Sequence, residues 1–326
     1  MTHYAPMIAA LVTLLITTIL LYSKIGKALQ DVPNERSLHD APIPRIGGIG
    51  IMAGVLTAWA LMLMSLAWWV VLPLLALIAV SLLDDKRGLP VRQRLLVQVI
   101  AAAVLVFGSG MAAQSILLAL MVLPCVVWMT NLYNFMDGSD GLAGGMTFFG
   151  FTMYGLAALM HGDDTMAMLN FSVAAAALGF LYYNLHPAQV FMGDAGSIPL
   201  GFLAAAMGLW GWEQGHWPGW FPLLVFLPFV ADATVTLVKR TLRGVKITEA
   251  HREHYYQRLV QIGWGHRNVA LFSYALMFAS GTSAIWGMRH STEWPWLLFL
   301  IWGSIYALLM LVLDSRWKAF QRKQHD

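Results

Sequence analysis

The chain has 326 residues, of which 59% are hydrophobic and only 11% are charged. A soluble domain carries about 25% charged residues, so this composition excludes an ordinary soluble globular protein. Most of the surface must face an apolar medium, which a lipid bilayer provides.

Apolar runs of about 20 residues recur along the chain, and each is long enough to cross the hydrocarbon core as a helix. A helix satisfies its own backbone hydrogen bonds in lipid, and the sequence lacks the alternating pattern of a membrane β-barrel. We therefore expect an all-α integral membrane protein of about eleven transmembrane helices, with one polytopic domain over residues 1–326. The predicted spans are 5–23, 46–65, 67–83, 95–111, 114–133, 143–160, 166–184, 197–212, 220–238, 269–287 and 294–313.

The connections between these spans alternate between the two sides of the membrane. One side has the loops 24–45, 84–94, 134–142, 185–196 and 239–268 and the tail 314–326. These segments contain 19 of the 20 lysines and arginines, and short loops rich in these residues stay in the cytoplasm. The pattern predicts a periplasmic N-terminus and a cytoplasmic C-terminus. The net charge of +3 follows from this topology and suits anionic membrane lipids, so we expect no nucleic-acid partner.

Polar residues gather where four predicted cytoplasmic loops meet the helix ends. The four clusters are Asp84 and Asp85; Asn131, Asn134, Asp137 and Asp140; Asn184, His186, Phe191 and Asp194; and His251, Arg252, His254 and Arg258. Each cluster taken alone is also compatible with a solvated helix end or a tight turn. Together they indicate that the function lies on the inner face.

The adjacent carboxylates Asp84 and Asp85 repel each other, so they require a divalent cation or a nearby arginine. Hard oxygen ligands suit Mg²⁺, which typically takes one or two carboxylates together with substrate phosphates and water. Basic neighbours such as Lys86, Arg92 and Arg94 suit phosphate oxygens. These residue types predict a polyanionic substrate that a metal ion holds at the cytoplasmic interface.

Two further features have competing interpretations. Asp232 lies inside the predicted span 220–238, where an ionisable residue is either functional or paired with a lysine or arginine near the inner end. The stretch from Gly47 to Gly54 contains a G-x-G fragment, but no strand precedes it. It therefore indicates close helix packing through small residues rather than dinucleotide binding.

In this order along the chain, the motifs resemble those of the polyprenyl-phosphate N-acetylhexosamine-1-phosphate transferases. That family includes phospho-N-acetylmuramoyl-pentapeptide transferase and the enzymes that start O-antigen and teichoic acid synthesis. The resemblance covers almost the whole chain, and the predicted topology matches that of the family. The similar stretches are R-S-L-H-D-A-P-I-P-R-I-G-G at 36–48, D-D at 84–85, N-F-M-D-G-S-D-G-L-A at 134–143, V-F-M-G-D-A-G-S at 190–197 and H-R-E-H-Y-Y-Q-R at 251–258.

The resemblance implies an enzyme that transfers N-acetylhexosamine 1-phosphate, or a 6-deoxy relative, from a UDP-sugar to undecaprenyl phosphate and releases UMP. It implies a Mg²⁺ cofactor, with Mn²⁺ as an alternative. It also implies a protein of the bacterial inner membrane whose active site faces the cytoplasm and which starts a cell-surface glycan. The oligomeric state stays open, and a homodimer is one option.

The same resemblance also implies roles for individual residues. Asp194 matches the family's metal ligand, and Asp84 and Asp85 match a pair of which one deprotonates or orients the lipid phosphate. Arg94 falls where some relatives carry a lysine that contacts phosphate, which makes it a catalytic candidate. The positions that match nucleotide-binding residues are Asn134, Asp137, Asp140, Asn184 and Phe191.

The last cytoplasmic loop departs from the family pattern. His254 aligns with the first histidine of the H-H-H-F-E stretch of the pentapeptide transferases, whereas Tyr256 and Gln257 replace the other two. This difference argues against the pentapeptide substrate. The stretch found here instead resembles that of the enzymes that act on O-antigen precursors. We expect His254 to be catalytic and Arg252 and Arg258 to bind the diphosphate. Tyr255 and Tyr256 are expected to offer apolar faces to the sugar.

A transporter with carboxylates inside the membrane is the alternative from another functional class. Such a protein should carry ionisable residues deep in several spans. Asp232 is the only strongly ionisable residue inside the predicted spans, whereas the acidic clusters lie at helix ends. The sequence therefore favours the enzyme.

Overall fold

The computed structural model describes residues 2–33, 38, 41–246, 251–290 and 295–325, so part of the motif at 36–48 and part of the loop 239–268 lie outside the described residues. Helices dominate the described chain. The longer ones are α1 (Ala5–Leu21), α3 (Gly47–Ala60), α4 (Trp68–Arg87), α5 (Val91–Gly108), α7 (Ile116–Phe135), α8 (Leu142–Met160), α9 (Asp164–Asn184), α10 (Asp194–Glu213), α12 (Leu227–Leu242), α14 (Gly265–His290) and α15 (Pro295–His325). The short elements are η1 (Thr2–Tyr4), α2 (Lys24–Ala28), β1 (Gln30–Asp31), β2 (Ile43–Pro44), η2 (Leu63–Ser65), α6 (Met111–Gln114), α11 (Phe221–Val225), α13 (Tyr255–Leu259) and η3 (Val260–Trp264).

The number of helices that could span a membrane differs from the sequence-based expectation. Each of the eleven predicted spans falls on helical structure, but only nine helices in the described chain are long and apolar enough to cross a bilayer. Helix α3 has 14 residues, and a helix of that length rises only about 21 Å. The span predicted over 220–238 divides at Phe226 into α11 and α12. Pro222 and Pro228 are each the second residue of one of these helices, where a missing backbone N–H costs nothing.

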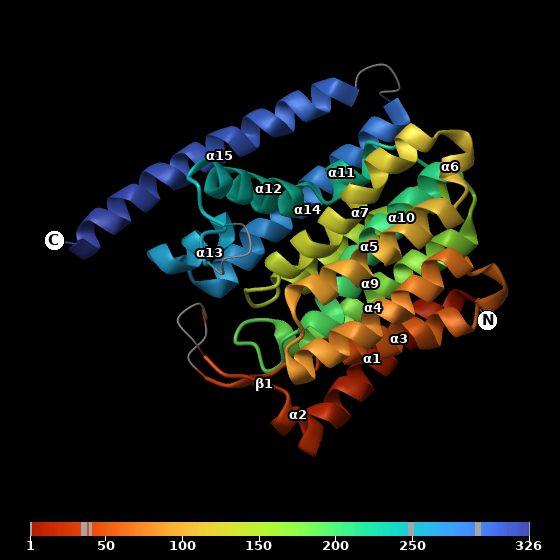
Figure 1. The fold of residues 1–326 in the computed structure, drawn as a ribbon, viewed down its shortest axis with the longest axis horizontal. Helices are drawn as coiled ribbons and strands as arrows, with labels where there is room; N and C mark the ends of the chain where they lie inside the picture. The colour runs from red at the N-terminus through yellow and green to blue at the C-terminus, as the bar shows by residue number, and fades with distance from the viewer. Residues whose placement is uncertain (1, 34–37, 39–40, 247–250, 291–294, 326) are drawn as a thin grey trace.

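Helices α8, α9 and α10 form the interior of the bundle. In an apolar stretch of 18 residues in α10, 83% of the residues are buried. In a stretch of the same length in α15, only 11% are buried. Helix α10 packs against α4 and α7, while α9 packs against α8 and α1 (Figure 1). Helix α10 therefore runs through the centre of the bundle.

The glycine-rich stretch in α3 allows close helix packing, as the sequence predicted. A Cβ atom on Gly48 would lie 2.2 Å from the backbone nitrogen of Gly196 in α10. Cβ atoms on Gly50 and Gly54 would each lie 2.1 Å from a threonine hydroxyl of α1. Small residues therefore let α3 approach α1 and α10 directly, which is the usual way membrane helices associate.

Helix α15 is attached to the bundle more loosely than the other long helices. It packs against α13 and α14, and an apolar cavity of about 520 Å³ separates it from α12. Trp302 and Tyr306 line this cavity from α15, and Lys239 and Asp314 lie at one end of it. The last helix thus stands away from α12 over most of its length (Figure 1).

The loops that carry the predicted site lie together at one end of the bundle. Figure 1 shows α13 at the left, where α15 also ends, β1 and α2 below it, and the N-terminus at the right. The strands β1 and β2 pair in an antiparallel hairpin, and Arg45 forms a bridge with Phe191. The backbone of loop 24–45 is therefore joined to that of loop 185–196.

The orientation of the bundle in the membrane gives the first prediction. Tags placed at the C-terminus or within 239–268 should be reachable only from the cytoplasm, because these two segments contain 11 of the 20 lysines and arginines. Labelling of intact cells and of inverted vesicles with an impermeant reagent measures this directly. A tag placed beside Asp163 should give the opposite pattern, and periplasmic labelling of the C-terminus would overturn the proposed orientation.

Candidate active site

Three carboxyl groups and one arginine come together where α4, α5 and α10 meet. The Arg94 Nη1 atom in the first turn of α5 donates to Asp84 Oδ2 at 2.7 Å and to Asp194 Oδ2 at 3.0 Å. Asp84 Oδ1 also accepts a hydrogen bond from the backbone of Leu89 at 2.6 Å. Arg94 therefore bridges carboxylates from two different helices, and the structure brings together residues that are 100 positions apart.

Asp85 accepts hydrogen bonds from the N-terminus of α10. Its Oδ1 accepts from the backbone nitrogen of Asp194 at 3.2 Å, and its Oδ2 accepts from that of Ala195 at 2.9 Å. Gly193 precedes the helix with φ +73°, a conformation that glycine adopts without strain. The positive end of the α10 dipole and these two N–H groups favour a negative charge on Asp85. The compensation that the acidic pair requires thus comes from Arg94 and from a helix end.

Asn134 orients the carboxyl of Asp194. Its Nδ2 atom donates to Asp194 Oδ1 at 2.7 Å and to Ser197 Oγ at 2.9 Å. Since Arg94 donates to the other oxygen, both oxygens of Asp194 have a fixed donor. A carboxylate held in this way keeps one direction, which a metal ligand needs.

Asp137 adds a fourth carboxyl to the same region. Burial and the negative charges of Asp194 and Asp85 raise the pKa of Asp137 well above its usual range. The positive charge of Arg45 acts in the opposite direction. Asp137 is therefore harder to ionise than a carboxyl group in water.

The second half of the D-G-S-D-G motif lies in a separate cluster of polar residues. Asp140 Oδ2 lies 2.7 Å from His186 Nδ1, and His266 Nδ1 lies 3.7 Å from Asp140 Oδ1. The two histidine rings stack with centroids 5.6 Å apart. His266 Nδ1 also lies 2.9 Å from the Ser139 hydroxyl. His186 thus contacts the carboxylate of the predicted nucleotide residue Asp140, and the backbone N–H of Asp140 donates to His266 Nδ1 at 3.4 Å.

Asn184 fixes the backbone on both sides of this region. Its Oδ1 accepts from the Gly141 nitrogen at 2.9 Å, and its Nδ2 donates to the Val190 carbonyl at 2.9 Å. Phe191 is half-buried, and its backbone bonds to Pro44 and Gly47. Asn184 therefore ties the loop 134–142 to the loop 185–196.

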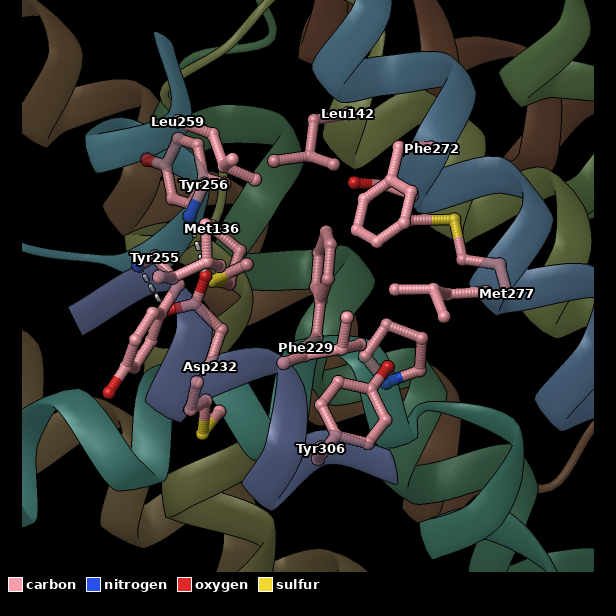
Figure 2. A pocket seen from close by; sticks show the side chains of 16 residues that line it. Met136, Leu142, Phe229, Asp232, Tyr255, Tyr256, Leu259, Phe272, Met277 and Tyr306 are labelled. Carbon is pink, nitrogen blue, oxygen red and sulfur yellow. Dashed lines mark hydrogen bonds between the residues drawn. The ribbon is translucent and has the colours of Figure 1, made fainter. Parts of the chain in front are cut away.

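The last loop lies beside these clusters but has its own partner in the membrane region. Asp232 accepts hydrogen bonds from the backbone nitrogens of Tyr255 and Tyr256, each at 2.9 Å, and so caps the start of α13 (Figure 2). His254 Nδ1 lies 3.4 Å from Asp232 Oδ1, and its ring stacks on Phe135 and Tyr256. Asp232, the ionisable residue inside the predicted span, thus stabilises the start of α13 in this loop.

The environment of Tyr255 and Tyr256 in this loop differs from the one expected from the sequence. Tyr255 and Tyr256 are only 5% and 3% exposed, so the expectation that both offer faces to a sugar is wrong. They line a small apolar cavity of about 60 Å³ beside Asp232 (Figure 2). Arg258 pairs with Asp314 of α15 at 2.9 Å, whereas Arg252 is exposed.

Several contributors to the site were not identified from the sequence. Ser197, Arg45 and His266 all take part through contacts with distant residues. Arg45 and Ser197 lie inside motifs that we singled out, so their positions carried a usable signal. His266 lies outside those motifs, and only the folded chain brings it to Ser139 and Asp140.

The donor set fits a hard cation such as Mg²⁺. The available atoms are the carboxylate oxygens of Asp84, Asp85 and Asp194, which lie close together. Within the described ranges, no three His, Cys, Asp or Glu side chains converge on one point. The protein would therefore supply one or two ligands, most directly Asp194, and phosphate and water oxygens would complete the shell.

Comparison with known proteins agrees with this geometry. The family model for glycosyl transferase family 4 matches residues 67–211, which include the aspartate pair, the D-G-S-D-G motif and Asp194. The chain is 29% identical to the probable undecaprenyl-phosphate N-acetylglucosaminyl 1-phosphate transferase of Bacillus subtilis, over 97% of this chain and 94% of that protein.

Two further relatives carry different substrate names. The decaprenyl-phosphate N-acetylglucosaminephosphotransferase of Mycobacterium tuberculosis is 32% identical, over 78% of this chain and 74% of that protein. The phospho-N-acetylmuramoyl-pentapeptide-transferase of Lactobacillus johnsonii is 31% identical, over 75% and 84%. With these matches over most of the chain, the protein belongs to glycosyl transferase family 4 and is a membrane phosphoglycosyltransferase.

Proposed function

We propose that the protein transfers N-acetylhexosamine 1-phosphate from a UDP-sugar to undecaprenyl phosphate at the cytoplasmic face of a bacterial inner membrane. The observation that carries the proposal is the meeting of Asp84, Asp85 and Asp194 with Arg94 at the ends of three helices. A lipid phosphate and a soluble nucleotide can meet only at such an interface. The names of two relatives give a polyprenyl phosphate and an N-acetylglucosamine phosphate group, which supports a transfer of this kind.

The proposed reaction joins two anions. An oxygen of the lipid phosphate attacks the phosphorus next to the sugar, the bond to the UMP phosphate breaks, and UMP leaves with the bridging oxygen. Asp194 would hold Mg²⁺, which would supply charge neutralisation for the diphosphate. Arg94 binds phosphate oxygens, and Asp84 or Asp85 orients or deprotonates the lipid phosphate.

The proposed donor is a UDP-N-acetylhexosamine, or its 6-deoxy relative, for O-antigen or a similar surface glycan. The relatives alone do not choose the sugar, because both N-acetylglucosamine and pentapeptide enzymes are similar to this chain. The support comes from the last loop, where Tyr256 and Gln257 stand in place of two histidines. Both side chains are buried, so they act on the sugar through the shape of the loop. Exposed Arg252 is the residue of this loop that we assign to the diphosphate.

The test of the reaction is an assay with purified protein. Undecaprenyl phosphate is supplied with a series of UDP-sugars, and UMP release is measured with and without Mg²⁺. Release that needs all three components supports the proposal. No release with any donor would contradict it.

Removal of the charge of Asp194 should abolish transfer. The Asp194→Asn variant keeps the volume of the side chain, and its single carbonyl oxygen can still accept from either Asn134 or Arg94, so we expect it to fold. Turnover should fall on the order of 10²- to 10³-fold, because an anionic ligand is lost. Glu213→Gln at the other end of α10 is the control and should keep wild-type activity. If Asp194→Asn were active with normal Mg²⁺ dependence, the metal site would lie at the aspartate pair.

The aspartate pair should behave as one unit. Asp84→Asn weakens the link to Arg94, and Asp85→Asn weakens the link to the α10 N-terminus, so each variant disturbs the position of Asp194. We expect each single change to lower turnover and the double variant to be no worse than the poorer single variant. Steady-state UMP release gives these values. Wild-type rates for both single variants would indicate that Asp84 and Asp85 only form a solvated helix end and have no role in transfer.

Competition among donors tests the sugar. We expect a UDP-N-acetylhexosamine to be used in preference to UDP-MurNAc-pentapeptide. A 6-deoxy relative should differ by about 10- to 200-fold at most, because one hydroxyl changes binding by only about 1–3 kcal/mol in an apolar pocket. The measurement is the ratio of lipid-linked products when several donors share one reaction. Efficient use of the pentapeptide donor would refute the substrate assignment.

A further inference from the structure

Asp314 on α15 accepts hydrogen bonds from two other elements. Arg258 Nη1 of α13 donates to Asp314 Oδ1 at 2.9 Å, and the Lys239 ammonium of α12 donates to Asp314 Oδ2 at 2.5 Å. The hydroxyl of Tyr255 lies 3.3 Å from both carboxylate oxygens. One carboxylate thus joins the last helix to α12 and α13.

Of the two charged partners of Asp314, Arg258 is shielded from solvent, whereas Lys239 is 41% exposed. The side chain of Arg258 is only 10% exposed, and its guanidinium lies over the rings of Tyr255 and Trp317 at 5.2 and 5.5 Å. Charged hydrogen bonds in such a shielded place are stronger than those at an open surface. The cluster therefore fixes α13 more firmly than an exposed ion pair would.

Elsewhere α15 packs against α13 and α14 but lies apart from α12. The cavity of about 520 Å³ separates it from α12, and Lys239 and Asp314 lie at the end of that cavity. Only 11% of the residues are buried in the most apolar window of α15. Asp314 thus holds this end of α15 to α13 together with apolar packing between the two helices.

Helix α13 in turn contacts the loop that carries catalytic candidates. The Tyr256 hydroxyl donates to the Phe135 carbonyl at 3.0 Å. A Cβ atom on Gly138 would lie only 2.3 Å from that hydroxyl. Phe135 follows Asn134, which orients Asp194, and Gly138 follows Asp137. A shift of α13 would therefore reach the carboxylates through packed atoms.

We propose that Asp314 is a positioning residue for the phosphosugar transfer, and that it acts by holding α13 against the 134–142 loop. This inference rests on the proposed function. It also assigns Arg258 a role different from diphosphate binding: its guanidinium transmits the position of α15 to α13. A displacement of about 1 Å at a reacting group can cost 10²-fold in rate. A weaker contact between α13 and the 134–142 loop therefore has a measurable effect.

A double-mutant cycle distinguishes this role of Arg258 from direct binding of substrate. Asp314→Asn and Arg258→Gln should each lower kcat/KM for the UDP-sugar about tenfold, and the double variant should be no worse than either. Asp314→Glu should restore part of the loss. Ser315→Ala is the matched control on α15, because its hydroxyl bonds only within the helix, to the Leu311 carbonyl. It should match the wild type.

Kinetic constants are compared per folded molecule, with the monodisperse fraction and the Tm of each variant measured in detergent. A loss of folded protein alone lowers the apparent maximal rate and leaves KM unchanged, whereas displacement of α13 also changes KM for the UDP-sugar. Tyr255→Phe removes only one hydroxyl from the cluster. It serves as a milder variant if Asp314→Asn does not stay monodisperse.

Hydrogen exchange of the backbone tests, without any activity assay, whether Asp314 holds α13 against the 134–142 loop. Asp314→Asn should increase exchange in 251–259 and in 134–141, and Ser315→Ala should not. Unchanged exchange in both segments, or independent multiplicative effects of Asp314→Asn and Arg258→Gln, would overturn the proposal. A wild-type protein that releases no UMP would instead contradict the proposed function, and the exchange result would still decide whether Asp314 holds α13.

Discussion

Repulsion among carboxyl groups is the constraint on which this site depends. Asp84, Asp85, Asp137 and Asp194 lie in one region at the end of an apolar bundle, where solvent screens their charges poorly. Arg94 bridges two of them, and the N-terminus of α10 binds a third. The remaining negative charge makes the site suitable for a cation and for phosphate groups that arrive with it.

Because a helix end provides part of this compensation, the helices must be placed accurately. Small residues make this possible: Gly48 of α3 faces Gly196 of α10 with almost no space between the backbones. Helix α10 is also the most buried of the helices long enough to span a bilayer. Close packing of small residues resists displacement, so the start of α10 stays beside the aspartate pair.

Two other carboxylates hold the segment 251–259. Asp232 binds the backbone at the start of α13, and Asp314 binds side chains that α13 projects toward α15. Both come from apolar helices, where an ionised group is costly unless it is fully bonded. Their use here links the loop next to the catalytic candidates to the membrane helices beneath it.

The sequence by itself determined the membrane class, the helical segments, the close packing of the α3 glycines and the set of acidic residues at helix ends, because apolar periodicity and small-residue patterns act locally. It did not determine that Pro222 and Pro228 would start two separate helices instead of one span. Only the tertiary structure decided that Asp232 caps α13, that Tyr255 and Tyr256 are buried and that Arg258 pairs with Asp314. The physical reason is distance along the chain: Asp232 and Tyr255 are 23 residues apart, and Arg258 and Asp314 are 56 apart. Local patterns carry no information on such pairings, which depend on how whole helices pack.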